Sequence, residues 1–304
     1  MSGIRLDGRV AIVTGAGRSL GRAYALALAA AGAAVVVNDV DAASAGAVVE
    51  EIRAAGGSAT AAIAAVGSTA AAEELVRTAV DTFGRLDVLV ANAGVLRDRV
   101  LWKMSDEEFD LVVETHLRGT FTCARAAASF LREQGEGGRI VLIGSPAGQF
   151  GSFGQTNYAA VKAGIVAMAR TWSLELARAG ITVNAVVPTA LSPMTATIPA
   201  YAQAWEDHLA GLPVPPELRR EKALGTPDDV APLVVWLASE RAAGVTGQAI
   251  GIGGDRLTLY AHPRVLDTDH RDGGWSAEEI DAAWADRFGA QAQPSGPPSR
   301  REDA

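Results

Sequence analysis

The stretch Thr14-Gly15-Ala16-Gly17-Arg18-Ser19-Leu20-Gly21 follows a short aliphatic run, residues 10–13, and leads into a segment of helical period. Glycines in a turn between a strand and a helix let the backbone bend sharply and approach a ligand closely. The free amides and the dipole of the following helix favour a pyrophosphate there. An ordinary turn is the alternative, but a place between the first strand and the first helix favours dinucleotide binding. The expected cofactor contacts are Gly15, Gly17, Arg18, Ser19, Leu20 and Gly21.

The rest of the chain alternates short aliphatic runs with longer amphipathic segments. The runs are rich in valine and isoleucine without polar alternation, which is typical of strands buried on both faces. They cover residues 10–13, 34–37, 86–90, 139–143, 181–187 and 248–252, and the helical segments cover residues 22–31, 42–55, 70–83, 106–132, 158–178 and 227–238. Strands that alternate with helices pair in parallel. The pattern therefore predicts a Rossmann-like, doubly wound α/β fold with a seven-stranded parallel sheet in a single domain, residues 1–254.

Two regions interrupt the alternation. Residues 195–224 form an insertion with a proline cluster, and insertions of this size beside a sheet are usually functional, so we expect a lid over residues 190–225. Residues 255–289 predict a C-terminal extension with a short helix, because Ser276 and Glu279 have the spacing of a capping box. Residues 290–304 are rich in proline, glycine, serine and charge, which predicts a disordered tail.

Composition excludes several classes of protein. The 304 residues are 49% hydrophobic, enough for a sizeable core, and 27 basic against 35 acidic residues give a net charge of −8. An acidic chain argues against a nucleic-acid surface or attraction to anionic lipid. The single cysteine, Cys123, excludes an internal disulfide framework and is expected to be buried.

No membrane span, secretory signal or metal site is expected. No apolar run reaches the roughly 18 residues of a membrane helix, and the first six residues are too short and polar for a signal peptide. The histidines show no metal-ligand spacing. The sequence therefore predicts a soluble cytoplasmic protein.

Asp39 follows the second aliphatic run, eighteen residues after Gly21. A carboxylate there accepts hydrogen bonds from the adenosine ribose and repels a 2′-phosphate. Two observations argue against NAD binding by Asp39. Its carboxylate can instead cap a helix, and Arg18 is a cation that can bind a 2′-phosphate. Because repulsion at a desolvated carboxylate outweighs attraction to a flexible arginine, we expect NAD rather than NADP.

Tyr158 and Lys162 lie four residues apart at the start of a predicted helix, which places both side chains on one face. An ammonium beside a phenol lowers the pKa of the phenol from about 10 toward the working pH. Such a phenol accepts the proton of an alcohol, or returns it to a carbonyl, as hydride moves to or from nicotinamide. Ser145, after the run at residues 139–143, can hold the substrate oxygen. Each residue alone is more often structural; together they predict a catalytic set.

With these motifs the chain resembles the short-chain dehydrogenase/reductase family over residues 6–254. Further matching features are Ala91-Asn92-Ala93-Gly94, Asn184 with Pro188, and the ending at residues 247–254. Within the family it is most similar to the (3R)-hydroxyacyl-CoA dehydrogenase unit of peroxisomal multifunctional enzymes and actinobacterial relatives. The segments that carry this closer likeness are Val37-Asn38-Asp39, Leu96-Arg97-Asp98-Arg99, His116-Leu117-Arg118-Gly119 and Phe153-Gly154-Gln155-Thr156-Asn157-Tyr158.

The resemblance implies further site residues. His116 stands where the family has the asparagine of its catalytic tetrad, so it either holds a water relay to Lys162 or is a structural histidine facing inward. Ala65 replaces an adenine-contacting aspartate, which leaves that contact to the backbone of Val66. Ser19 replaces a glycine of the family loop. The other cofactor contacts that the resemblance implies are Asn92, Ala93, Gly94, Tyr158, Lys162, Pro188 and, for the nicotinamide carboxamide, Ser192.

The predicted function is hydride transfer between a nicotinamide cofactor and a secondary alcohol or ketone. The resemblance favours a 3-hydroxyacyl-CoA as the substrate, and the apolar residues of the lid leave a hydroxysteroid as the alternative. A catalytically silent dinucleotide-binding scaffold is a third interpretation, which the intact catalytic set opposes. Apolar faces on residues 106–132 and 158–178 exceed what one sheet layer needs, so we expect a homotetramer or homodimer.

Overall fold

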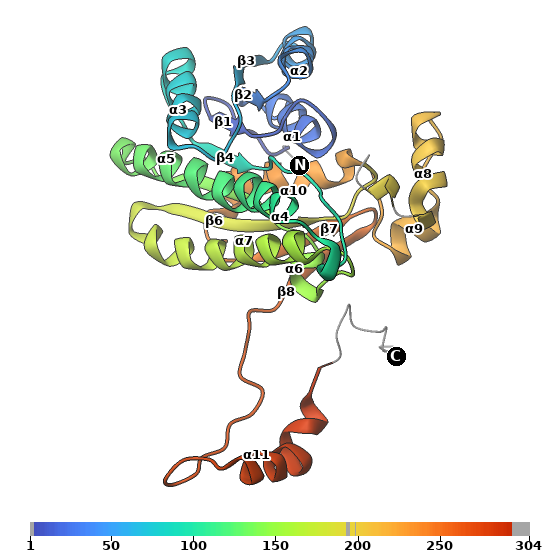
Figure 1. The fold of residues 1–304 in the computed structure, drawn as a ribbon. Coiled ribbons are helices and arrows are strands. Elements are labelled where there is room, and N and C mark those ends of the chain that lie inside the picture. The colour runs from blue at the N-terminus through green and yellow to red at the C-terminus, as the bar shows by residue number, and fades with distance from the viewer. Residues whose placement is uncertain (1–2, 193–194, 198, 294–304) are drawn as a thin grey trace. The chain divides into compact units, whose positions relative to one another are not determined.

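The computed structural model describes residues 3–192, 195–197 and 199–293 of the chain. Its central sheet has the strand order β3-β2-β1-β4-β5-β6-β7-β8 (Figure 1). The strands are β1 (Val10–Val13), β2 (Ala34–Asp39), β3 (Ser58–Ile63), β4 (Val88–Ala91), β5 (Gly138–Ile143), β6 (Ile181–Pro188), β7 (Ala249–Gly253) and β8 (Arg256–Tyr260). Strands β1 to β7 pair in parallel. The predicted Rossmann-like, doubly wound α/β fold is confirmed, and the strand order reverses between β1 and β4, where such folds bind ligands.

Helices cover both faces of the sheet. On one face pack α1 (Ser19–Ala30), α2 (Ala42–Ala54) and α10 (Pro227–Ala238); on the other pack α3 (Thr69–Phe83), α5 (Gly119–Gln134) and α7 (Thr156–Glu175). Successive strand residues alternate between the two layers: in β1, Ala11 and Val13 face the first and Val10 and Ile12 the second. Because both faces are buried, the strands read as unbroken aliphatic runs. Cys123 is buried in the second layer, as expected.

The predicted count of seven strands is corrected to eight. Strand β8 pairs antiparallel to β7 with Gly253 opposite Arg256, so that Gly254 and Asp255 form a two-residue hairpin turn. This strand lies in the segment assigned to the C-terminal extension. Its Leu257 and Leu259 are each 68% exposed, since an edge strand leaves its backbone and one of its faces uncovered. The Gly-Asp pair was the available signal for a hairpin.

The predicted helix over residues 106–132 is three consecutive pieces. Helix α4 (Asp106–Val112) begins at a capping box of Ser105 and Glu108 and continues into a π-helical turn, η2 (Val113–Arg118), before α5. Single π-turns widen a helix locally and often occur at functional sites. Here the wide turn carries His116. The remaining short helices of this part are η1 (Leu101–Lys103), α6 (Ala147–Phe150), η3 (Ala177–Ala179) and η5 (Glu240–Ala242).

The insertion between β6 and α10 has a small core of its own. It contains η4 (Thr195–Thr197), α8 (Pro199–Leu209) and α9 (Pro216–Glu221), drawn in gold in Figure 1. Arg219 of α9 donates two hydrogen bonds of 2.8 Å to Asp229 of α10 and one of 2.8 Å to Asp255. Arg219 thus ties the insertion to α10 and to the turn between β7 and β8, and the amide of Asp255 also donates to the carbonyl oxygen of Arg219. The core of the insertion consists of Leu191, Ala204, Val214 and Leu224, with Tyr201, Trp205 and Leu218 packed against it.

The chain divides into two compact units, Met1–Tyr260 and Ala261–Ala304. In the second unit, α11 (Ala277–Ala283) has the predicted capping box of Ser276 and Glu279 and continues into η6 (Trp284–Phe288) and η7 (Gly289–Gln291). Arg287 pairs with Asp267 at 2.5 Å. Of the predicted disordered tail, residues 294–304 lie outside the described residues. None of the helices in the described part of the chain has the length and hydropathy needed to cross a bilayer.

Candidate active site

The glycine-rich turn between β1 and α1 is braced by the end of β4. Asn92 donates to the carbonyl oxygens of Thr14 (2.9 Å) and Gly15 (3.1 Å), and the backbone amides of Asn92 and Ala93 donate to the Thr14 hydroxyl. A Cβ atom at Gly21 would lie 2.1 Å from the carbonyl oxygen of Gly15, so no other residue fits there. The turn therefore keeps its shape through these contacts, and at Gly21 only a glycine fits.

Ser19 adopts a backbone conformation that favours glycine. Its φ is +49°, in the left-handed region, whereas it stands where the family has a glycine. A non-glycine residue with positive φ is strained unless its surroundings hold it there. The turn thus has the glycine geometry that the resemblance implies, although it carries a serine.

Asp39 ends β2 directly beside the glycine-rich turn. The side chain is 8% exposed, and its two oxygens accept hydrogen bonds from the backbone amides of Gly17 (2.9 Å) and Asp41 (3.1 Å). The alternative role of a helix cap belongs instead to Asp41, whose carboxylate accepts from the amides of Ala43 and Ser44 at the start of α2. Arg18 is exposed. The carboxylate of Asp39 thus lies at the turn with its position set by backbone amides.

The fold brings Ser145, Tyr158 and Lys162 together at the carboxyl edge of the sheet. Ser145 follows β5, and its hydroxyl accepts from the amide of Ala147 at 3.2 Å. Lys162 is 3% exposed, donates to the carbonyl oxygen of Ile143 at 2.6 Å, and places its Nζ 5.5 Å from the ring centre of Tyr158. The hydroxyl of Ser145 is close enough to the phenol of Tyr158 to lower its pKa. The three side chains therefore share one small volume, as their sequence positions predicted.

Burial sets the acidity of this group, and it corrects the expected effect of Lys162. Burial raises the pKa of Tyr158 to about 12, although the hydrogen bond from Ser145 lowers it in part. Burial also lowers the pKa of Lys162 to about 7. Both shifts have one cause, because a low-dielectric interior disfavours the charged form of each group. In the chain by itself, the desolvation of the phenol outweighs the neighbouring amine.

His116 lies against the ring of Tyr158. The two ring centres are 5.4 Å apart at an interplanar angle of 82°, and His116 is 2% exposed. Its Nε2 lies 2.8 Å from the carbonyl oxygen of Val95 and 3.0 Å from the backbone amide of the same residue, so Val95 holds this edge of the ring. Nδ1 is buried and has no partner among the residues that the structure describes. Burial lowers the pKa of His116 to about 3, so the ring is neutral.

The other predicted cofactor contacts follow strands of the same sheet. Gly94 packs against His116, since a Cβ atom at Gly94 would lie 2.2 Å from its Cε1. Val66 lies beyond β3 and packs against Gly119. Pro188 ends β6, and the hydroxyl of Ser192 accepts from the amide of Thr195 at 3.1 Å. All of these positions lie at the edge where parallel strands end, which is where this fold class binds its ligands.

Asn157 is a buried residue beside the candidate site to which the sequence reasoning assigned no role. It is fully buried, and its amide donates to the carbonyl oxygens of Arg97 (3.0 Å) and Glu108 (3.1 Å). Its side-chain oxygen accepts from the amide of Tyr158 at 2.7 Å. Asn157 therefore fixes the first turn of α7. A polar residue directly before the tyrosine was its only signal in the sequence.

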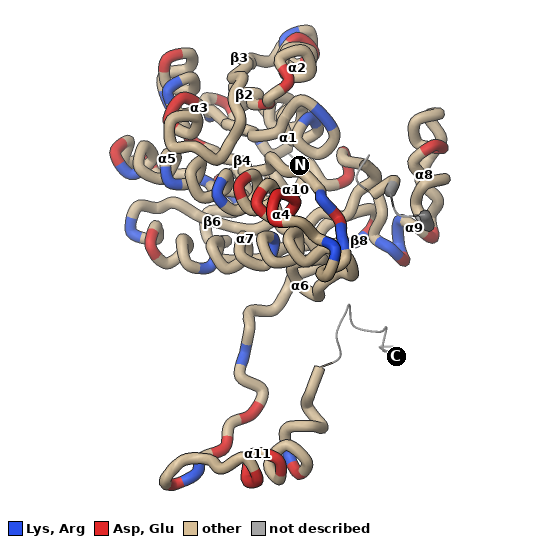
Figure 2. The backbone as a smooth tube through the Cα atoms, viewed as in Figure 1, with Lys and Arg blue, Asp and Glu red and all other residues tan. Residues whose placement is uncertain are grey.

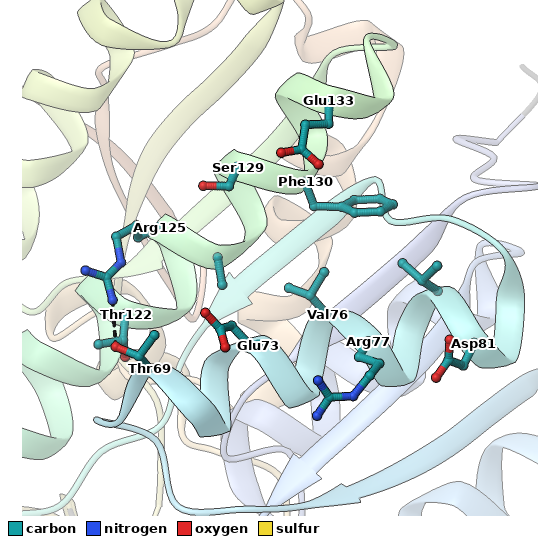
Figure 3. Close-up of a pocket in the computed structure, with 12 residues that line it drawn as sticks. Thr69, Glu73, Val76, Arg77, Asp81, Thr122, Arg125, Ser129, Phe130 and Glu133 are labelled. Atoms are coloured by element: carbon teal, nitrogen blue, oxygen red, sulfur yellow. Dashed lines mark hydrogen bonds between the residues drawn. The ribbon is translucent and has the colours of Figure 1, made fainter.

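A groove of about 730 Å³ between α3 and α5 is separate from these residues (Figure 3). Its lining includes charged groups such as Glu73, Arg77 and Arg125, and none of the predicted site residues. A second cavity of about 290 Å³ lies between the glycine-rich turn and the insertion, lined by Arg18, Ser19, Trp205 and His208 among others. The smaller cavity is the one that adjoins the candidate site.

Comparison with known proteins agrees with this geometry. A family model described as enoyl-(acyl carrier protein) reductase matches residues 15–254. The chain belongs to the short-chain dehydrogenase/reductase family. It is therefore an oxidoreductase acting on CH–OH groups, and its family and Rossmann fold imply a nicotinamide dinucleotide cofactor.

The chain matches its named relatives over different shares of their length. The chain is 44% identical over 248 residues to peroxisomal multifunctional enzyme type 2 of Mus musculus, a match of 79% of this chain and 31% of that protein. It is 42% identical over 296 residues to hydroxyacyl-CoA dehydrogenase ChsB1 of Mycobacterium tuberculosis, covering 93% and 89%. A crystal structure of a short-chain dehydrogenase from Mycobacterium avium superposes with a TM-score of 0.82 at 38% identity, covering 97% and 99%. The chain spans about a third of the mouse relative.

Proposed function

We propose that this oxidoreductase interconverts 3-hydroxyacyl-CoA and 3-oxoacyl-CoA thioesters, with NAD as the hydride carrier. The observation that carries the proposal is the convergence of Ser145, Tyr158 and Lys162 beside the glycine-rich turn. The acyl-CoA class is suggested by relatives whose names include hydroxyacyl-CoA dehydrogenase. In this proposal residues 190–225 act as the lid over the substrate.

The residues at the edge of the sheet fit a dinucleotide. The turn is packed so closely that no Cβ atom fits at Gly21, and it lies at the start of α1, where backbone amides favour a pyrophosphate. Asp39 would accept from the adenosine ribose hydroxyls and repel a 2′-phosphate, which favours NAD. The remaining cofactor contacts would be Arg18, Ser19, Leu20, Val66, Asn92, Ala93, Gly94, Tyr158, Lys162, Pro188 and Ser192.

The protein's own part in the reaction is proton transfer and orientation. The chemistry that a bound nicotinamide supplies is acceptance of hydride from the carbinol carbon. The hydroxyl of Ser145 donates a hydrogen bond to the substrate oxygen, and Tyr158 accepts the hydroxyl proton as the carbonyl forms. In the reverse direction Tyr158 returns that proton. Lys162, held by the carbonyl of Ile143, stabilises the phenolate and holds the ribose.

His116 completes the proposed proton route. Its Nδ1 is a buried polar atom on a ring that packs against Tyr158, and it has no partner among the described residues; such an atom usually binds water. A water held there would hydrogen-bond toward Lys162 and carry protons to solvent. The alternative is a structural role, in which the ring only fills the space left by Gly94.

A hydroxysteroid is the second candidate substrate. The observation that favours it is the apolar character of the insertion, where Leu209 and Leu212 are 63% and 55% exposed beside its small core. A rigid apolar ligand would cover such side chains as well as an acyl chain does. The CoA part of an acyl-CoA is charged and a steroid is not, so an assay in which the two compete distinguishes the candidate substrates.

The test is a turnover assay with a matched substrate panel. Purified protein is given NAD or NADP with (3R)-3-hydroxyacyl-CoA, its (3S) epimer, the free hydroxy acid and a hydroxysteroid, and reduced cofactor is followed by absorbance. We expect turnover of a 3-hydroxyacyl-CoA with at least about tenfold preference for NAD. A tenfold preference corresponds to a free-energy difference of about 1.4 kcal/mol. Turnover of the steroid alone contradicts the acyl-CoA proposal, and cofactor binding without any turnover favours the silent scaffold.

Cofactor choice has its own variant. Asp39→Ala removes the carboxylate that repels a 2′-phosphate, so the ratio of NADP to NAD use should rise about tenfold. Asp41→Ala is the matched control, because it removes a nearby carboxylate that caps α2. Equal use of both cofactors by the natural chain would mean that Arg18 outweighs Asp39.

We also propose that the chain forms a homodimer or homotetramer. Phe109, Leu111 and Phe121 of α4 and α5 are 38–41% exposed, and Leu174 of α7 is 79% exposed. Exposed apolar side chains on neighbouring helices commonly mark a subunit interface. Sedimentation at micromolar concentration should show an oligomer, and a monomer there would contradict the proposal.

A further inference from the structure

The π-helical turn η2 contacts two loops that follow strands of the central sheet. On one side of the turn, His116 lies against the loop after β4: its Nε2 is held by Val95, and a Cβ atom at Gly94 would lie 2.2 Å from its ring. On the other side, the Nε of Arg118 donates to the carbonyl oxygen of Gly67, in the loop after β3, at 3.0 Å. Because residues two apart on a helix do not share a face, one short turn reaches both loops.

The loop between β3 and α3, residues 64–68, is anchored at each end by a side-chain hydrogen bond. At its start, Asn38 of β2 donates to the carbonyl oxygen of Ala64 at 2.9 Å. At its end, the hydroxyl of Ser68 accepts from an amide in the first turn of α3 at 3.1 Å. Neither bond reaches residues 65–67, so the middle of the loop depends on other contacts.

The contacts to residues 65–67 come from η2 and the start of α5. Within the described part of the chain, the bond from Arg118 to Gly67 is the only hydrogen bond to these three residues. Glu114 pairs with Arg118 at 3.4 Å, and a Cβ atom at Gly67 would lie 2.7 Å from the Oε1 of Glu114. Val66 packs against the first residue of α5. The π-helical turn therefore holds the middle of the loop in place.

This loop borders the adenosine end of the proposed cofactor site. The amide of Ala64 donates at 3.2 Å to the carbonyl oxygen of Asp39, the residue that ends the neighbouring strand β2. In the proposed function, Asp39 binds the adenosine ribose. Ala65 has no side-chain group that can hydrogen-bond to the base, so recognition of the adenine falls to the backbone of the loop. Such a contact is only as precise as the position of the loop that makes it.

Arg118 does not belong to a surface of one charge sign. Figure 2 shows acidic and basic residues together along the neighbouring helices α3 and α5. The guanidinium of Arg118 is itself paired with Glu114. A mixed surface of this kind does not concentrate anions, so attraction of a phosphate does not explain the position of Arg118. Its bond to Gly67 is charge-assisted, because the donor is a guanidinium.

We propose that Arg118 is a positioning residue for the adenine end of the dinucleotide: its bond to Gly67 fixes the backbone of Val66, by which the base is recognised. This role rests on the proposed binding of a dinucleotide at the glycine-rich turn. The same turn η2 carries His116 beside Tyr158, so one six-residue element supports both ends of the cofactor site. Loss of the bond should weaken recognition of the base and leave the chemical step unchanged.

The test compares two dinucleotides that differ only in the base. NADH and reduced nicotinamide hypoxanthine dinucleotide have the same charge and nearly the same size, but hypoxanthine has an oxygen where adenine has its amino group. The Kd of each is measured by fluorescence titration of the full chain. The natural chain should prefer NADH about tenfold, the effect of about one hydrogen bond. In Arg118→Met the Kd of NADH should rise about fivefold and that of the hypoxanthine dinucleotide by less than about twofold.

Three further variants separate positioning from charge and from general structure. Arg118→Lys keeps a cationic donor for the carbonyl oxygen of Gly67, so it should keep most of the preference for NADH. Glu114→Gln removes only an exposed ion pair, and each Kd should change by less than about twofold. Arg125→Met on α5 removes a 2.7 Å bond to Thr69, outside residues 65–67, and both Kd values should match those of the natural chain.

The outcomes distinguish this role from the proposed function. An equal rise of both Kd values in Arg118→Met indicates a general loss of structure and overturns the positioning role, as does an unchanged Kd for NADH. A natural chain that binds the two dinucleotides equally also overturns it. A natural chain that binds neither contradicts the proposed dinucleotide binding, and the role of Arg118 with it. For a substrate that is turned over, Arg118→Met should raise the KM for NAD and keep kcat, since the proton-transfer groups are untouched.

Discussion

The glycine-rich turn and the insertion are held in place by different kinds of interaction. The turn at residues 14–21 is braced by the end of β4: the side-chain amide of Asn92 donates to the carbonyl oxygens of Thr14 and Gly15, and a Cβ atom at Gly21 would lie 2.1 Å from that of Gly15. The insertion has its own four-residue core, and Arg219 bonds it to Asp229 and Asp255. A turn packed this closely has little freedom, whereas an insertion with a small separate core can change with little effect on the sheet. In the proposed site, cofactor binding would therefore depend on the fold itself, and substrate recognition would depend on an element added to it.

Tyr158 is the proposed acid–base group, and changing it should have the largest effect. Tyr158→Phe removes the acid–base group but little volume, so kcat should fall by about a thousandfold, within the range of general acid–base catalysis. Cofactor affinity, measured by fluorescence titration, should stay within a few fold. Retained activity would place the proton transfer elsewhere, and lost cofactor binding would mean that the two regions are not separable.

Gly21→Ala tests how rigid the cofactor side is. The new methyl group would press on the backbone of Gly15, so we expect a loss of about 3 kcal/mol in stability together with loss of cofactor binding. Gly46→Ala in α2 is the matched control. Nothing lies within 4 Å of a Cβ atom at Gly46, and alanine favours a helix by up to about 1 kcal/mol over glycine. An unchanged thermal unfolding temperature in Gly21→Ala would show that the turn can adapt to a side chain.

The buried ring of His116 should make the folded state sensitive to acid. The folded-state pKa of His116 is lowered to about 3, so between that value and about 6.5 the unfolded chain binds more protons than the folded one. The free energy of unfolding should therefore be highest above about pH 6.5 and fall as the pH falls, by about 3 kcal/mol at about pH 4.5. Denaturant unfolding of His116→Asn should show a shallower decline over the same range. Parallel curves for the two proteins would contradict the burial of a neutral ring.

Arg219→Met, in the insertion, should have the smallest effect, and it should change only substrate binding. Without the bonds to Asp229 and Asp255, closure should weaken and the substrate KM should rise roughly tenfold, which is about 1.4 kcal/mol. Cofactor affinity should not change. Arg220→Met is the control, because Arg220 is 80% exposed and reaches Asp255 only at 3.7 Å. A fall in cofactor affinity would show that the insertion also supports the glycine-rich turn.

Much of the fold was accessible from local pattern. The buried strands β1, β5 and β6 are unbroken aliphatic runs, and the glycine-rich turn stands between a strand and a helix. The two edge strands were not located. Strand β3 reads Ser-Ala-Thr-Ala-Ala-Ile, and β8 exposes its leucines. An edge strand is covered on fewer sides, so its sequence lacks the continuous hydrophobicity by which buried strands are found.

The candidate catalytic residues were also found from local pattern, whereas their acidity was not. Tyr158 and Lys162 have a four-residue helical spacing that is visible in the sequence. The partners of Asn157, at residues 97 and 108, are far from it along the chain and no local pattern indicates them. The expected lowering of the Tyr158 pKa by Lys162 was wrong for the chain by itself, because burial of the ring has the larger effect.

The order of chemical groups along this chain therefore determined by itself the class of fold, the glycine-rich turn and the spacing of Tyr158 and Lys162, since each depends on a pattern within a few residues. Packing decided the rest: the π-helical turn that brings His116 to Tyr158, the separate core of the insertion, and the desolvation that raises one pKa and lowers another. These depend on contacts between segments distant in sequence and on the removal of water, which exist only once the chain has folded.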